Sequence, residues 1–344
     1  MMRAVEVMPM AAEQGALPRT MRAMVQEGTG SADVLALREV PLPEVADDRV
    51  LVKVRAASIN AADYHTVHGI PGAGVIGKIL KMGPGTTVRG IDVAGVVAAV
   101  GKDVTTLRPG DEVFGCGTGT WAEYATAPAR TLVTKPSRLS FIEAGSIGVA
   151  ALTALQAVRD HGKVKAGDEV LVYGAGGGVG TFAVQIAKAL GARVTAVTSS
   201  RNVDVVSTLG ADEVIDAAQE DALRRKQRYN AVIDVGAVRS INSLYRALKP
   251  SGQLVLVGAA KRGGAPALFG RIIAGMIRAR VLKQRLVFFI AKTRQDDLVF
   301  LKGLLEVGTI RALIERTYPL AEAREAVRYT LTGQARAKVV IEMS

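Results

Sequence analysis

Seven residues in the middle of the chain have the types and spacing of an anion-binding turn. They read GAGGGVG, from Gly174 to Gly180, and they follow a short apolar run at 170–173. Apolar residues then recur at helical spacing from 182 to 190. The first amides of a helix have no partner within it, and the helix dipole adds positive charge behind them. The sequence therefore predicts a phosphate site at this turn.

A strand–helix–strand unit must position the turn. Gly191 stands where a helix commonly ends in glycine, and a β-branched run at 193–197 follows it. In dinucleotide-binding units of this kind, Gly177 would let a pyrophosphate approach and Gly180 would let the helix pack closely on the strand. The mononucleotide alternative needs a Gly-Lys-Ser/Thr ending, which the turn lacks. The predicted cofactor contacts are Gly174, Ala175, Gly176, Gly177, Gly178, Val179 and Gly180.

The residues after the second strand bear on which dinucleotide binds. An NAD site usually carries Asp or Glu there for the ribose 2′-hydroxyl, and this chain has none. Hydroxyls and a guanidinium suit a 2′-phosphate instead, so we predict NADP(H). The residues concerned are Thr198, Ser199, Ser200 and Arg201. The alternative is that they form only a polar loop.

Composition indicates an ordinary globular chain. Its 344 residues, 49% of them hydrophobic, are enough for two domains with full cores. A single cysteine, Cys116, excludes a disulfide framework and a four-cysteine metal site, and suits a reducing compartment. No secretory signal is evident, so we expect a cytoplasmic location. Residues 1–20 lack periodicity and are expected to be a mobile extension.

The formal net charge of +12 is concentrated in one segment. Residues 261–294 hold nine Lys and Arg residues and no acidic residue, with apolar residues between them. A helix with a solvated basic face beside an anionic cofactor explains this pattern. The alternative is a cofactor-binding protein that associates with RNA or, weakly, with an anionic membrane surface. Aromatic stacking partners are lacking, so no specific nucleic-acid partner is predicted.

The pattern of elements predicts an α/β fold in two parts. Residues 21–141 contain short β-rich runs separated by glycine, proline and aspartate, typical of a mostly antiparallel, barrel-like domain. From residue 144 onward, helical patterns alternate with near-continuous apolar runs, as in a parallel sheet covered on both faces. Helices are expected over 144–162, 241–252, 294–308 and 322–333.

Seven motifs in order resemble the medium-chain dehydrogenase/reductase superfamily, most closely its zinc-free quinone oxidoreductase and alkenal/enone reductase branch. They are SINAADYH, VRGIDVAGVVAAVG, PGDEVFG, WAEYA, SIGVAALTAL, YGAGGGVGTFAVQIAKALGA and RTYPLAEAREAVRYTLTGQARAKVVI. The resemblance implies a GroES-like catalytic β-barrel domain at 21–150, completed by 291–344, and a doubly wound Rossmann domain at 151–290. It also implies a cofactor cleft between them and a homodimer formed through the last strand of the parallel sheet.

The resemblance also bears on metal binding. Zinc-dependent members place Cys, Gly-His-Glu and Cys around the metal, and the matching positions here are Asn60, 90–92 and Val149. Catalytic zinc needs about three ligands from Cys, His or carboxylate. No metal is therefore expected.

Without a Lewis acid, conjugate reduction is the easier hydride transfer, because the charge spreads over an enolate that hydrogen-bond donors can hold. We expect a quinone or an α,β-unsaturated carbonyl as substrate, with an enoyl thioester as an alternative. Candidate donors follow the third β-rich run, at Asn60, Asp63, Tyr64 and His65. The resemblance implies that Asn60 and Asp63 border the nicotinamide and substrate; Tyr64 or His65 would supply a proton. The alternatives are that Asn60 and Asp63 only brace a turn and that His65 is a surface residue.

The remaining predicted contacts lie around the nicotinamide. The resemblance implies that Thr153 touches its carboxamide or ribose, and Gly258 and Phe289 are expected to flank the ring. Lys338 is expected to reach a phosphate, although a lysine on a strand is usually solvated.

Overall fold

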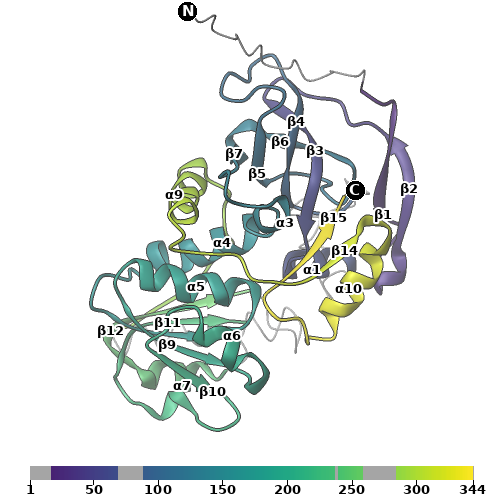
Figure 1. Ribbon diagram of the computed structural model, residues 1–344. Coiled ribbons are helices and arrows are strands. Elements are labelled where there is room, and N and C mark those ends of the chain that lie inside the picture. The colour runs from purple at the N-terminus through teal and green to yellow at the C-terminus, as the bar shows by residue number, and fades with distance from the viewer. Residues whose placement is uncertain (1–16, 69–87, 237–238, 259–283, 344) are drawn as a thin grey trace, which may run out of the picture.

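The structure is a computed structural model, and it describes residues 17–68, 88–236, 239–258 and 284–343. Residues 1–16 of the expected N-terminal extension and residues 261–283 of the basic segment lie outside the described residues. Figure 1 shows two bodies, one of purple, blue and yellow elements and one of teal and green elements.

The first body is built on a mostly antiparallel sheet with the order β14-β15-β3-β4-β5-β7, in which β6 also pairs with β3. Its strands are β3 (Arg49–Ser58), β4 (Asp92–Val100), β5 (Glu112–Cys116), β6 (Tyr124–Pro128), β7 (Leu132–Thr134), β14 (Ile314–Pro319) and β15 (Lys338–Glu342). A two-stranded sheet, β1 (Thr20–Gln26) and β2 (Leu35–Pro41), accompanies it. Because β15 pairs antiparallel with β3, the C-terminal segment returns to the N-terminal sheet, as the yellow strand in Figure 1 shows.

The second body is a six-stranded parallel sheet with the order β10-β9-β8-β11-β12-β13. Numbered along the chain, this is the 3-2-1-4-5-6 order of dinucleotide-binding folds, so the predicted doubly wound sheet is confirmed. Its strands are β8 (Glu169–Tyr173), β9 (Arg193–Thr198), β10 (Glu213–Asp216), β11 (Tyr229–Val235), β12 (Leu248–Val257) and β13 (Arg285–Phe288). The bounds predicted for the two domains stay predictions.

Helices flank both sheets. The α-helices are α1 (Ala61–His68), α3 (Phe141–Ala144), α4 (Gly148–Leu155), α5 (Gly178–Ala189), α6 (Val203–Ser207), α7 (Ile241–Ala247), α9 (Gln295–Glu306) and α10 (Ala323–Leu331). A π-helical segment, η3 (Gln156–His161), continues α4. Short 3-10 turns are η1 (Ala32–Val34), η2 (Ala129–Thr131), η4 (Ser200–Asn202), η5 (Ala222–Arg224) and η6 (Leu320–Glu322). Among the described residues, no helix is long and apolar enough to cross a membrane.

The central strand β8 buries both of its faces. Val170 and Val172 belong to the core shared with α4 and α5, whereas Leu171 and Tyr173 belong to the core on the opposite face. Side chains alternate between the two faces of a strand, so a sheet covered on both sides selects an uninterrupted apolar run. This rigid centre holds the glycine turn that follows it.

Two expected helices differ from the structure. The helix expected over 144–162 begins only at Gly148, as α4, and continues as η3, whereas Ala144 is the last residue of α3. The helix expected over 241–252 ends at Ala247, and β12 already begins at Leu248. Pro250 explains the second difference, because proline lacks an amide hydrogen and clashes with the preceding helical turn.

Candidate active site

The glycine turn, Gly174–Gly180, joins β8 to α5. Gly174 has φ +82°, a conformation that favours glycine, and the amides of Gly174 and Ala175 both donate to the Val197 carbonyl at 3.0 Å. Gly177 precedes the first residue of α5 and provides no side-chain cap for it. The first turn of the helix therefore presents backbone amides to whatever lies against it.

Glycine is required at different positions of the turn for different physical reasons. A Cβ at Gly180 would stand 2.2 Å from the Gly174 carbonyl oxygen, so only glycine permits this close approach of helix and strand. A Cβ at Gly176 would stand 2.4 Å from the side-chain nitrogen Nδ2 of Asn202 and 2.6 Å from the Thr198 hydroxyl. At Gly177 the nearest atom would be 3.6 Å away, in ordinary contact. The turn is thus tightly packed at Gly176 and Gly180 and open at Gly177.

The four residues predicted to face a 2′-phosphate follow β9, beside the turn. Thr198 is buried, whereas Ser199, Ser200 and Arg201 are exposed. Arg201 donates from Nη2 to the Gly333 carbonyl at 2.8 Å, which ties this loop to the C-terminal part of the chain.

Asn202 is a residue that the sequence analysis missed. It is buried beside Gly176, and its Oδ1 has no hydrogen-bond partner within the described residues. Its position directly after the four predicted residues was the only available signal. A buried acceptor without a partner next to the turn is suited to a donor from a ligand.

A second group of polar residues, here called the polar cluster, lies in the first body. Asp92 at the start of β4 is fully buried, and its Oδ2 accepts from the Ser58 hydroxyl at 2.5 Å and from Asn60 Nδ2 at 2.9 Å. Its Oδ1 accepts from the Val149 amide at 2.6 Å. The Lys338 ammonium is 3.3 Å from Asp92 Oδ2. The cluster consists of Ser58, Asn60, Asp92, Val149 and Lys338.

Asp63 lies directly beside this cluster. It is in the first turn of α1, and its Oδ2 accepts from the Asn60 amide at 2.8 Å. Burial raises the pKa of Asp63 to about 7, and the nearby Asp92 adds to the rise, while Lys338 and Arg89 oppose it. Tyr64 and His65 follow on the same helix, but their side chains lie outside the described residues.

The C-terminal segment connects the turn to the cluster. The Ala337 amide donates to the Gly176 carbonyl at 2.9 Å, and Ala337 also forms a bridge with Gly177. A Cβ at Gly178 would stand 2.9 Å from Lys338 Cδ, so the lysine stem runs along the turn before its ammonium enters the cluster. The structure therefore brings the glycine turn and the Asn60 region together. A phosphate contact by Lys338 stays a prediction.

The other predicted contacts lie at different distances from the glycine turn and the polar cluster. Thr153, in α4, donates from its hydroxyl to the Val149 carbonyl at 2.6 Å, one turn from the cluster. Gly258 follows β12 with φ +80°, at the same carboxyl edge of the sheet as Gly174. Phe289 follows β13, and its ring packs on His161 with centroids 4.2 Å apart. Phe289 also packs against the apolar core that α4 and α5 share.

Comparisons with known proteins identify the family. The profile described as "Alcohol dehydrogenase GroES-like domain" matches residues 46–137, and the one described as "Zinc-binding dehydrogenase" matches 209–341. A "Quinone-oxidoreductase QR1, chloroplastic" from Triphysaria versicolor is 30% identical, over 94% of this chain and 99% of the relative. The chain belongs to the medium-chain dehydrogenase/reductase superfamily. The predicted family and the predicted GroES-like domain are thereby confirmed.

Further relatives of this superfamily member have related names. "NADPH-dependent alkenal/one oxidoreductase, chloroplastic" from Arabidopsis thaliana is 30% identical, over 94% of this chain and 80% of the relative. The solved quinone oxidoreductase from Coxiella burnetii is 32% identical, covers 94% of this chain and 100% of its own, and superposes with a TM-score of 0.82. The chain is thus an NAD(P)H-dependent oxidoreductase by family.

The polar cluster contains residues at the positions that, in zinc-dependent members of the superfamily, surround the metal. Asn60, Asp92 and Val149 occupy those positions and meet in space. Across the described residues, no group of three or more His, Cys, Asp or Glu side chains could hold a metal ion. Cys116 is buried in the core, and burial raises the pKa of its thiol to about 12, with Asp92 adding to the rise, so it remains protonated at neutral pH.

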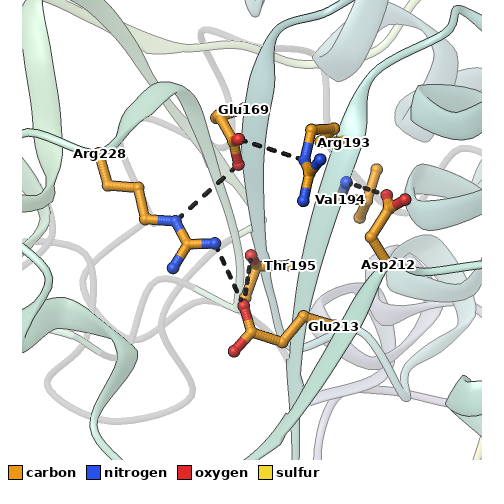
Figure 2. Close-up of a pocket in the computed structure, with 7 residues that line it drawn as sticks. All are labelled: Glu169, Arg193, Val194, Thr195, Asp212, Glu213 and Arg228. Atoms are coloured by element: carbon orange, nitrogen blue, oxygen red, sulfur yellow. Dashed lines mark hydrogen bonds and ion pairs between the residues drawn. The ribbon is translucent and has the colours of Figure 1, made fainter.

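A hollow of about 240 Å³ at the opposite edge of the parallel sheet belongs to a different surface of this dehydrogenase/reductase (Figure 2). It is lined by residues at the amino ends of β8, β9 and β10, and its charges are paired. Arg193 contacts Glu169 at 3.3 Å, and Arg228 contacts Glu213 at 3.4 Å. Ligands of open α/β sheets bind at the carboxyl ends of the strands, so this hollow is not the candidate active site.

Proposed function

We propose that the protein is an NADPH-dependent reductase that transfers hydride to a quinone or an α,β-unsaturated carbonyl without a catalytic metal ion. One observation carries the proposal. The polar cluster around Asn60 and Asp92 lies against the same C-terminal segment, Ala337 and Lys338, that contacts the glycine turn. An amide donor and a buried carboxyl group therefore adjoin the predicted cofactor site.

The residues at the turn fit a dinucleotide. Gly177 leaves space where a pyrophosphate would approach the first amides of α5, and Asn202 offers a buried acceptor beside Gly176. Arg201 and the exposed hydroxyls of Ser199 and Ser200 are suited to a 2′-phosphate. We propose that these residues hold NADPH, with Thr153 and Gly258 toward the nicotinamide. Bound there, the nicotinamide would supply the hydride.

The residues of the cluster suit a reaction whose negative charge grows on an oxygen. Asn60 Nδ2 donates one hydrogen to Asp92, which leaves the second for a substrate oxygen. Such a donor stabilises an enolate in a water-poor site. Asp63, with its pKa near 7, is placed to hold the proton that the product requires. Tyr64 and His65 stay alternative proton donors.

The donor set supports the proposal of metal-free chemistry. The positions matched to zinc ligands provide an amide, one carboxylate and a backbone amide, and the Lys338 ammonium is 3.3 Å from the carboxylate. Zinc is bound by about three ligands from Cys, His or carboxylate. A fixed cation at this distance also repels a second one.

We further propose a homodimer formed through β13. This strand is the last in the parallel sheet, and its outer edge has no partner strand among the described residues. An exposed edge strand is a ready template for pairing with a second copy. A cytoplasmic location stays a prediction.

The test monitors NADPH oxidation by absorbance, with and without EDTA. The substrate panel contains quinones, enones, alkenals, enoyl thioesters, and the aldehydes and ketones that correspond to simple alcohols. We expect turnover of quinones or enones that is unchanged by EDTA. Activity confined to the aldehydes and ketones of simple alcohols, or activity lost in EDTA and restored by zinc, would contradict the proposal.

A further inference from the structure

Lys338 is a cation held in the protein interior. Its side chain is 3% exposed, and it donates to Asn60 Oδ1 at 2.7 Å, to Asp92 Oδ2 at 3.3 Å and to the Ile59 carbonyl at 3.4 Å. An ammonium has three hydrogens, so these three acceptors use all of them. The buried charge is therefore held by the polar cluster, and the predicted phosphate contact of Lys338 would require one of these bonds to break.

The backbone before Lys338 is also unusual. Ala337 has φ +51°, a conformation in which a residue with a side chain is strained. A buried ion pair seldom stabilises a fold more than well-packed apolar residues of similar volume would. The combination of a strained residue and a buried lysine is therefore better explained by a task at the site than by stability.

The contacts of Lys338 define the orientation of the Asn60 side-chain amide. Its oxygen faces the ammonium and its nitrogen faces Asp92. A positive charge on an amide oxygen polarises the group and strengthens its N–H donors. The same charge compensates the Asp92 carboxylate, which would otherwise oppose negative charge growing on a nearby substrate oxygen.

We propose that Lys338 is a positioning residue for the reduction: its buried ammonium fixes and polarises the Asn60 amide and neutralises Asp92. This inference rests on the proposed function and adds a role that the reaction itself does not require. Because its stem lies along Gly178, Lys338 also sets the distance between the Asn60 amide and the glycine turn.

The experiment compares Lys338→Met with Lys338→Met/Asp92→Asn, in which no charge is left unpaired. Lys249→Met is a matched control, because Lys249 also donates to an asparagine side chain, Asn230, at 2.9 Å, but far from the cluster. We expect kcat of both Lys338 variants to fall about 100-fold, with KM for the substrate and the fluorescence-measured Kd for NADPH changed less than about 3-fold. Lys249→Met should keep the wild-type kcat.

A second measurement separates a missing charge from a damaged fold. In Lys338→Ala, added ethylammonium should restore at least about tenfold in kcat, whereas neutral propanol should not. Wild-type kcat in the double variant, or equal effects of the two additives, would overturn the inference while leaving the proposed function intact. A wild-type enzyme that reduces nothing in the substrate panel would overturn both.

Discussion

The amide of Ala337 donates to the carbonyl oxygen of Gly176 at 2.9 Å, and this bond fastens the C-terminal segment to the glycine turn. Ala337 immediately precedes β15, which pairs with β3, the strand that leads to Asn60. The position of the Asn60 region relative to the predicted cofactor site therefore depends on a short backbone connection.

Ala337→Pro should loosen this connection. Proline has no amide hydrogen and requires φ near −65°, whereas Ala337 has φ +51°. We expect at least about a tenfold weaker Kd for NADPH, equivalent to about 1.4 kcal/mol. Ala337→Gly, which accepts positive φ, is the control and should bind normally in the same fluorescence titration. Equal affinities in the two variants would contradict this role of the connection.

Two glycines of the turn should separate stability from binding. Gly180→Ala places a Cβ against the Gly174 carbonyl, so we expect a loss of about 1–3 kcal/mol in unfolding free energy and a lower Tm. In Gly177→Val the Cβ would meet no atom closer than 3.6 Å, and the side chain would fill the space before α5. This variant should keep the wild-type Tm and lose NADPH binding. Tight NADPH binding by Gly177→Val would refute the placement of the pyrophosphate.

Stability should depend on pH through Asp63. Its pKa is about 7 in the folded protein against an ordinary value of 3.8, so the folded chain holds a proton that the unfolded chain releases between these values. The stabilisation is complete below pH 3.8 and is lost as the pH rises through 7.

The check is urea unfolding of the wild type and Asp63→Asn at several pH values. The wild type should lose about 2–3 kcal/mol relative to the variant between pH 5 and pH 8. A difference that stays constant over this interval would show that Asp63 titrates normally in the fold.

Arg201 should select the phosphorylated dinucleotide. Removing its guanidinium in Arg201→Ala should weaken NADPH binding about tenfold and leave NADH binding within about twofold, because only NADPH carries the 2′-phosphate. Arg193→Ala is a matched control, since Arg193 begins the strand whose carboxyl end Arg201 follows, and it pairs with Glu169. Isothermal titration with both dinucleotides measures the ratio. An unchanged ratio in Arg201→Ala would remove Arg201 from the site.

The parts of the fold that the sequence predicted are those with local signals. The glycines of the turn and the apolar period of α5 lie within about twenty residues, and Gly191, with φ +82°, directly follows the C-cap of α5, where a helix-ending glycine was predicted. The helix α1 was not predicted as a helix, because AADYHTVH has almost no apolar periodicity. At its start the Asn60 backbone amide donates to the Asp63 carboxyl group, and further along Val67 packs in the core.

The residues of the candidate site also divide into those with a local sequence signal and those without one. Asn60 and Asp63 were found because they follow a strand and match a family motif. The ammonium of Lys338 lies against Asn60 although 278 residues separate them, and Asp92 joins them from a third segment. No local pattern reveals such a contact, so the sequence suggested a solvated or phosphate-binding lysine. Asn202 escaped notice for a similar reason, because only the folded turn buries its amide.

In the proposed reaction, hydride passes from NADPH to the β-carbon of an unsaturated carbonyl in a metal-free site. The most direct measurement uses EDTA-treated protein and NADPH that carries deuterium at C4 on the transferred face, with an alkenal as substrate. We expect a saturated aldehyde with deuterium on its β-carbon, seen by NMR. Deuterium on the former carbonyl carbon of an allylic alcohol, or label transfer only after zinc is added, would contradict it.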